Sequence, residues 1–106
     1  MKNLMNLYEN ADWEKAEGYP KGTFKKDLRD DKFGKTILLK LPENFQMKPH
    51  SHITTEQHLV LEGEYVSSGK TYKSGCYQIF NPGDEHGPFE SKKGALILVI
   101  WDVLTK

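Results

Sequence analysis

Short apolar runs alternate with clusters of turn residues from about residue 35 onward. Residues 44–52 form an extended segment in which Pro49 marks a strand edge or kink. Strands at roughly 8–12-residue spacing, with turns between them, predict an all-β sandwich or barrel. The chain shows no long amphipathic helix, so α/β architectures are disfavoured. Besides residues 44–52, the predicted strands are residues 35–41, 57–66, 70–80 and 94–103.

The N-terminal third has a different pattern, in which Trp13, Tyr19, Phe24 and Phe33 are spread among charges and glycines. Glycine and proline punctuation of this kind predicts extended pieces and turns. We therefore expect residues 1–34 to form an extended segment that packs on a barrel made by residues 35–106, the two together being one domain.

Length and charge narrow the class of protein. A chain of 106 residues cannot supply a (β/α)₈ barrel of roughly 250 residues. The 15 Lys and Arg residues balance 15 Asp and Glu residues, which argues against a nucleic-acid partner. The single cysteine, Cys76, excludes an internal disulfide and a Cys₄ zinc module. No apolar run approaches the ~20 residues of a membrane helix, so we expect a cytoplasmic protein without a membrane partner.

The histidines are concentrated in one part of the chain. His50 and His52 are two residues apart in an extended segment, so both imidazoles can point to the same face of a strand. Glu56 follows after three residues, which is enough for a bend into the next strand. The complete set of histidines is His50, His52, His58 and His86.

A turn precedes the last histidine. Pro82 and Gly83 are typical of the second and third positions of a type II turn, which can present His86 across a barrel. Three imidazoles and one carboxylate suit a divalent first-row metal. The alternative is that these are ordinary strand and loop histidines. Amidohydrolase-type H-x-H sites need a much larger barrel, and a zincin site needs two histidines four residues apart on a helix.

Two segments resemble the motifs of the cupin family. PHSHITTEQHLVLEG meets every spacing of the first motif, which is H-x-H, three residues, E, six residues and G. GCYQIFNPGDEHGPF resembles the second motif, although Pro82 and Gly83 are adjacent and Glu90 replaces the usual Asn. The adjacent Pro-Gly pair and the following Pro-Phe are similar to the cupin domain of ChrR-type anti-sigma factors and to acetylacetone-dioxygenase-like cupins.

This resemblance implies a double-stranded β-helix, or jelly roll, with a ligand cavity in its mouth. It also implies one divalent metal ion, with Fe, Mn, Ni and Zn left open. The family's ligand positions carry over to His50, His52, Glu56 and His86. Anti-sigma relatives have an additional helical sigma-binding domain, for which 106 residues leave no room, so we expect no direct sigma-factor inhibition.

Strand parity extends these expectations to the neighbours of Glu56. If Glu56 points inward, His58 does too, close to the metal but unligated. His58 is then a candidate catalytic residue, either as a general base or through a hydrogen bond to a metal ligand. The alternative is an interior histidine whose hydrogen bonds are all made within the protein. Leu59 and Leu61 point outward and need cover. Together with the apolar residues 95–101, they predict a homodimer.

Two classes of function remain open. A divalent metal with three neutral histidines and one carboxylate keeps a charge of +1, which favours an enolate, carboxylate or diketonate. The first class is a metalloenzyme acting on a small oxygenated organic molecule, as a dioxygenase, an isomerase or a lyase. The second is a non-catalytic metal- or ligand-binding sensor or storage protein, which zinc held by all four ligands would favour. A metal-stabilised structural barrel is a weaker third alternative.

Overall fold

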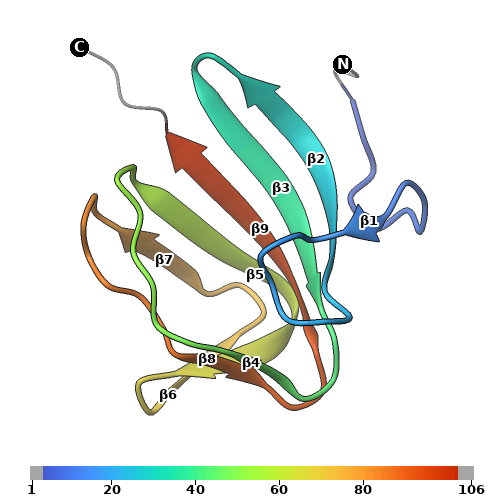
Figure 1. The fold of residues 1–106 in the computed structure, drawn as a ribbon. Coiled ribbons are helices and arrows are strands. Elements are labelled where there is room, and N and C mark those ends of the chain that lie inside the picture. Colours follow the sequence, from blue (N-terminus) through green and yellow to red (C-terminus); the bar gives the residue numbers. More distant parts are fainter. Residues whose placement is uncertain (1–3, 103–106) are drawn as a thin grey trace.

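The computed structural model describes residues 4–102 and confirms the all-β prediction, because every regular element in that range is a strand. It therefore holds no helix that is long and apolar enough to cross a membrane. Residues 1–3 of the predicted N-terminal segment, Val103 of the predicted strand and residues 104–106 lie outside the described range. In chain order the strands are β1 (Glu14–Lys15), β2 (Phe24–Asp31), β3 (Gly34–Leu41), β4 (Phe45–Met47), β5 (Glu56–Ser67), β6 (Lys70–Lys73), β7 (Tyr77–Phe80), β8 (Phe89–Ser91) and β9 (Ala95–Asp102) (Figure 1).

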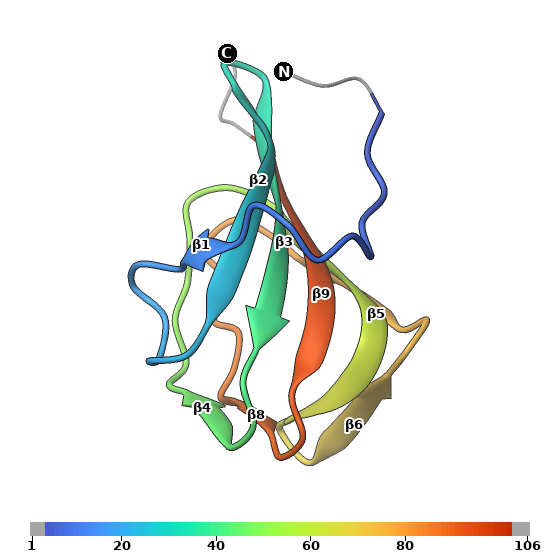
Figure 2. The same ribbon diagram turned by 90° about the vertical axis from the view of Figure 1, so that its right-hand side faces the viewer.

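The strands form one curled antiparallel sheet in the order β1-β2-β3-β9-β5-β8-β4, with β6 and β7 also paired to β5. The long strand β5 belongs to both halves of the curl (Figure 2). Its first part pairs with β9 and β7, and its second part pairs with β6 and β8. A register shift between Val60 and Glu62 and a positive φ of 73° at Gly63 mark the bend. The predicted strand 57–66 is therefore one bent strand.

The inner face of the curl holds the core. Along β5, Glu56, His58 and Val60 are buried, whereas Leu59 and Leu61 are only half-buried, as the expected parity requires. The sheet halves meet through aromatic and branched side chains. Burial alternates along the first part of β5, whereas β3 and β9 each bury three consecutive residues. The core cluster includes Ile37, Leu39, Phe45, Val60, Tyr65, Phe89, Ile97 and Val99.

The N-terminal third contributes more regular structure than the sequence predicts. Strand β2 pairs with β3 from Phe24↔Lys40 to Asp31↔Gly34, with one bulge. Its sequence, FKKDLRDD, is rich in residues that are depleted in strands, and no residue of it is fully buried. Pairing to the buried strand β3 therefore stabilises it. The turn between them is held by Asp31, whose Oδ1 accepts hydrogen bonds from the backbone of Phe33 and Gly34 at 2.8 and 3.2 Å.

Alanine at Gly63 is expected to destabilise the fold by about 3 kcal/mol, because a Cβ there would lie 2.5 Å from the carbonyl oxygen of Gly94 in addition to the strain of a positive φ. The matched control is Gly69→Ala, which has a φ of 79° but open space around the new Cβ. It should lose only about 1 kcal/mol. Urea unfolding midpoints measure both, and equal losses would show that the close approach at Gly63 is unimportant.

Candidate metal centre

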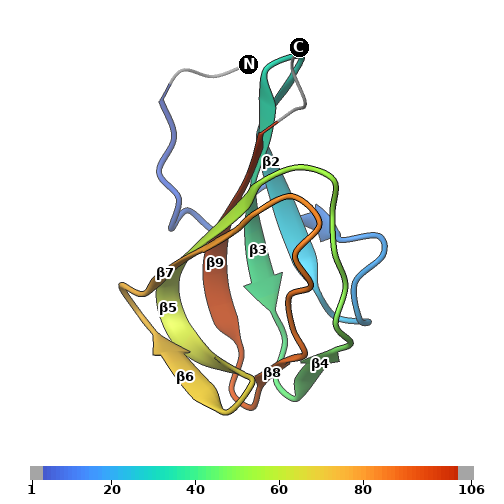
Figure 3. The same cartoon turned by 90° about the vertical axis from the view of Figure 1, so that its left-hand side faces the viewer.

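Backbone pairing between two loops brings the ends of the histidine motif together. The amide of His50 donates to the carbonyl of His86 at 2.9 Å, and the amide of His86 donates back at 2.8 Å. The amide of Gly83 also donates to the carbonyl of His52 at 2.8 Å. The β4–β5 and β7–β8 loops consequently run side by side at one end of the curl (Figure 3). Residues 36 positions apart in the sequence thus share one site.

The turn that presents His86 has the predicted form. The amide of Asp84 donates to the carbonyl of Asn81 at 3.0 Å, and Gly83 has a φ of 84°. A positive φ at the third position is what a type II turn requires, and glycine adopts it without strain. The Pro-Gly pair therefore forms the turn that directs the loop toward His50.

Four donor groups converge at this point. One ligand atom from each of His50, His52, Glu56 and His86 lies within 4.8 Å of the others. The ring centroids of His50 and His86 are 4.3 Å apart, and those of His50 and His52 are 5.1 Å apart. Glu56, the first residue of β5, places its Oε1 3.2 Å from Nε2 of His52. The structure thus brings together all four residues that the sequence selects.

Glu56 is fixed by two further hydrogen bonds from side chains. Its Oε2 lies 2.5 Å from Nε2 of His58, and its Oε1 accepts a hydrogen bond from Nε1 of Trp101 at 2.5 Å. Trp101 lies opposite Glu56 in the β5–β9 pairing. The sequence gives no role to Trp101, because that register becomes visible only in the folded sheet.

His58 lies beside the cluster and contacts it through Glu56. Its other ring nitrogen, Nδ1, is 3.3 Å from the hydroxyl of Tyr65, which donates to Oε1 of Gln78 at 2.7 Å. His58 is therefore held between a carboxylate and a phenol, so it can orient Glu56. The tyrosine and the glutamine are further residues that the sequence does not single out.

The protonation states at the cluster suit a metal. Burial alone would raise the pKa of Glu56, but the hydrogen bond and charge of His58, the charge of His86 and the hydrogen bond of Trp101 lower it below its usual value. Burial lowers the pKa of His86, and the charge of Glu56 opposes this only in part. An ionised carboxylate and a neutral imidazole are the forms that coordinate metals.

His86 provides the test of whether the residues fit a metal. Both of its ring nitrogens are buried and make no hydrogen bond within residues 4–102, although Nε2 lies 3.5 Å from Oε2 of Glu56. A buried polar atom without a partner costs roughly 1–3 kcal/mol, and such atoms are rare in folded proteins. A divalent ion bound by one of these nitrogens would remove that cost. Three nitrogens and one carboxylate oxygen are a suitable donor set for such an ion.

A small cavity reaches the cluster from inside the curl. Its volume is about 30 Å³, which is roughly the space of one water molecule. Besides three polar residues of the site region, its walls are mainly apolar. The lining residues are Tyr19, Leu39, Leu41, Phe45, Met47, His50, Glu56, His58, Tyr65, Phe89, Ile97 and Val99.

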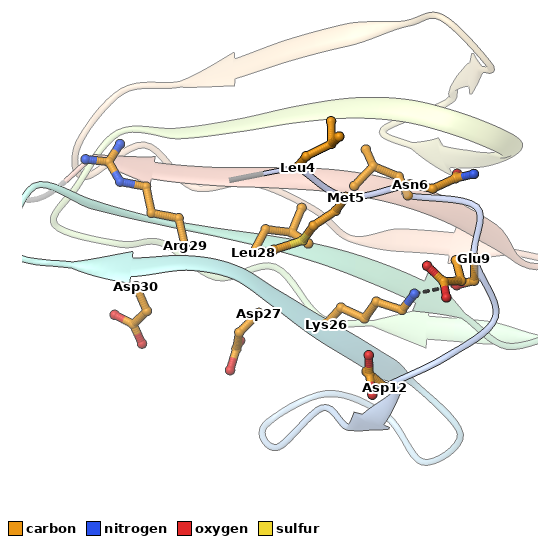
Figure 4. A pocket seen from close by; sticks show the side chains of 11 residues that line it. Leu4, Met5, Asn6, Glu9, Asp12, Lys26, Asp27, Leu28, Arg29 and Asp30 are labelled. Carbon is orange, nitrogen blue, oxygen red and sulfur yellow. Dashed lines mark hydrogen bonds between the residues drawn. The ribbon is translucent and has the colours of Figure 1, made fainter. Parts of the chain in front are cut away.

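A larger groove of about 450 Å³ lies elsewhere, between the N-terminal segment and β2 (Figure 4). No residue of the histidine cluster lines it. Acidic and basic side chains are mixed along its walls, and Lys26 donates to the carbonyl of Glu9 across it. The groove is thus separate from the candidate metal centre.

Comparison with known proteins identifies a family that matches almost the whole chain. The model of the ChrR cupin-like domain family matches residues 3–103. No curated protein matches the chain.

Solved structures share the fold at low sequence identity. An RmlC-like cupin from Shewanella frigidimarina is 16% identical with a TM-score of 0.79, covering 100% of this chain and 95% of that one. The anti-sigma protein ChrR, solved in complex with SigE of Rhodobacter sphaeroides, is 23% identical with a TM-score of 0.75, covering 90% of this chain and 51% of ChrR. An acetylacetone dioxygenase from Acinetobacter johnsonii is 14% identical with a TM-score of 0.73, covering 96% and 77%. These matches confirm the cupin jelly roll.

Proposed function

Because the chain belongs to the family of ChrR cupin-like domains, we propose that it binds one divalent metal ion through His50, His52, Glu56 and His86 and uses it to transform a small oxygenated anion. The observation that carries this proposal is the convergence of these donors around His86, whose buried ring nitrogens make no hydrogen bond to any described residue.

The charge of the site selects the ligand. A divalent ion, one ionised carboxylate and three neutral imidazoles sum to +1, which attracts a carboxylate, enolate or diketonate. The ion supplies Lewis-acid polarisation of such a ligand. Glu56 provides the negative charge and is held in place by His58 and Trp101. An apolar cavity wall lies beside His50, whereas the side chain of His52 is 41% exposed to solvent.

The geometry offers one group for proton transfer. His58 is buried, lines the cavity and contacts both Glu56 and the hydroxyl of Tyr65. In the proposed enzyme it orients Glu56 and can exchange a proton with a ligand in the cavity. A dioxygenase, an isomerase and a lyase would all use these residues in the same positions.

A non-catalytic sensor or storage protein is the second candidate, and the cavity favours it. Small-molecule sites usually enclose ≈ 300–1,000 Å³, at least about ten times the 30 Å³ found beside the cluster. One experiment separates the two functions. The protein is loaded with Fe²⁺, Mn²⁺, Ni²⁺ or Zn²⁺ and incubated with small carboxylates and β-diketones, with and without O₂, and products are followed by NMR. Conversion supports the enzyme, and binding without conversion supports the sensor.

We also propose that two copies associate through the outer face of the sheet. Tyr77 and Ile79 of β7 are each 54% exposed, and Tyr77 lies opposite the half-buried Leu59 of β5. Leu59 in turn lies opposite Leu98 of β9, so an apolar row crosses three strands. A second copy of the same face would cover this row.

Ile79→Asp is expected to convert the dimer to a monomer, because it places a charge beside the apolar row in the proposed interface. Sedimentation velocity at micromolar concentration measures the mass, with twice 12.2 kDa expected for the unchanged chain. Phe33→Asp is the control, since Phe33 is 63% exposed but lies in the β2–β3 turn. A monomeric unchanged chain would contradict the proposal, as would a dimer that tolerates Ile79→Asp.

A cytoplasmic location completes the proposal. It rests on the composition of the chain and on Cys76, which is a free thiol in the structure. Fractionation of cells that make the protein at its natural level would test it. Recovery of the protein outside the cytoplasmic fraction would contradict it.

A further inference from the structure

The cavity beside the metal centre has a defined mouth. All but three of its lining residues are buried, and the three that reach the surface are Tyr19, Met47 and His50. The cavity therefore opens between the β1–β2 loop, the end of β4 and the first histidine of the cluster. Figures 2 and 3 place the β1–β2 loop and β4 on the same side of the molecule. A molecule entering the cavity from solvent passes these three side chains.

The loop that carries Tyr19 is anchored at both ends. The amide of Ala16 donates to the carbonyl of Thr23 at 3.0 Å, and both residues are buried, at 6% and 3% exposure. Within the loop, Oγ1 of Thr23 donates to the carbonyl of Pro20 at 2.7 Å, and the amide of Tyr19 donates to the carbonyl of Ala16 at 3.3 Å. The backbone beneath Tyr19 is thus fixed, and its ring packs against the core from a rigid base.

The hydroxyl of Tyr19 can act as a donor at the mouth. Burial raises the pKa of this hydroxyl far above its usual value, and the negative charge of Glu56 raises it further. The group therefore stays protonated at neutral pH. The hydroxyl is not among the hydrogen-bonding side chains of residues 4–102, so it is available to an incoming ligand.

We propose that Tyr19 determines which ligands reach the metal centre, with its ring limiting the length of a ligand's apolar tail and its hydroxyl donating a hydrogen bond to the ligand's oxyanion. This inference rests on the proposed function. Its geometric basis is the position of the ring in the mouth of a cavity that holds roughly one water molecule. An acid with a long tail fits only if this ring is removed.

A chain-length series of carboxylates tests the inference. The full chain is loaded with Co²⁺, and its visible absorption spectrum is titrated with formate, acetate, butyrate and hexanoate. Three variants are compared with the unchanged chain: Tyr19→Ala removes the ring, Tyr19→Phe removes only the hydroxyl, and Tyr8→Ala is a control at a tyrosine that is 59% exposed and does not line the cavity.

The unchanged chain should prefer the short acids. Tyr19→Ala should raise the affinity for hexanoate relative to acetate by at least about tenfold, since each methylene buried in an apolar cavity strengthens binding about fourfold. Tyr19→Phe should keep the length profile and weaken all four acids by about three- to tenfold, the value of one hydrogen bond. Tyr8→Ala should behave as the unchanged chain does.

The outcomes separate this inference from the proposed function. An unchanged chain that binds no Co²⁺, or whose cobalt spectrum does not respond to formate or acetate, would overturn both. A cobalt site that responds to short acids, with the same hexanoate-to-acetate ratio in Tyr19→Ala, would overturn the role of Tyr19 alone. If Tyr19→Ala fails to fold, Tyr19→Leu provides the shorter side chain, and the same ratio decides.

Discussion

Replacing His86 by alanine is expected to lower the affinity for a divalent metal by more than about 100-fold, because it removes a metal ligand. Loss of a residue that only hydrogen-bonds to a metal ligand typically lowers metal affinity by about 10–100-fold. The side chain of His86 is 1% exposed, and its backbone pairing with His50 does not depend on the imidazole. The variant should therefore keep the loop geometry while losing one donor. Titration calorimetry with Mn²⁺ or Zn²⁺ measures the affinity, and circular dichroism checks the fold.

His58→Ala is the matched comparison, because it removes a buried imidazole that touches Glu56 but is not one of the four converging donors. Its affinity should fall by about tenfold, through the looser orientation of Glu56. If His86→Ala kept its affinity within about threefold, the proposed ligand set would be wrong. If His58→Ala lost more affinity than His86→Ala, His58 would be the true fourth ligand.

Saturating metal is expected to stabilise the fold strongly. A ligand present at 100 times its dissociation constant adds ≈ 2.7 kcal/mol to the free energy of unfolding if only the folded chain binds it. For a domain of this size, that corresponds to a rise in Tm on the order of 10–20 °C. The physical source is the set of four converging donors, which includes one of the two buried ring nitrogens of His86.

Differential scanning calorimetry with and without a chelator measures this shift. The control is His86→Ala, whose Tm should change little on adding metal. A shift below about 2 °C in the unchanged chain would mean that the cluster does not couple metal binding to folding, and it would contradict the account.

The fold could be predicted where one strand face is buried and local patterning is strong. Residues 35–41 and 94–103 are apolar and β-branched, and they correspond to β3 and to β9 up to its last described residue, Asp102. Strand β2 was not predicted, because its stability comes from pairing with β3 and its own residues are mostly charged. The three-residue strand β8 was not predicted either, since so short a run carries no periodicity.

The candidate site could be predicted to the extent that it is encoded by local spacing. Two histidines two residues apart in an extended segment and a Pro-Gly turn before His86 indicate convergence without knowledge of the sheet. Trp101 and Tyr19 could not be found in this way. Trp101 reaches Glu56 through the β5–β9 register, and Tyr19 reaches the cavity through the placement of a loop on the curled sheet. Both depend on long-range pairing, which a single sequence does not reveal.

The central claim is that the four converging residues hold one metal ion, and metal analysis of protein purified without a metal-affinity tag tests it most directly. The account predicts about one divalent ion per chain in the unchanged protein and almost none in the double variant His50→Ala/His86→Ala, which retains only His52 and Glu56 of the cluster. Elemental analysis by mass spectrometry gives both values and identifies the metal. Full metal content in the double variant would contradict the account.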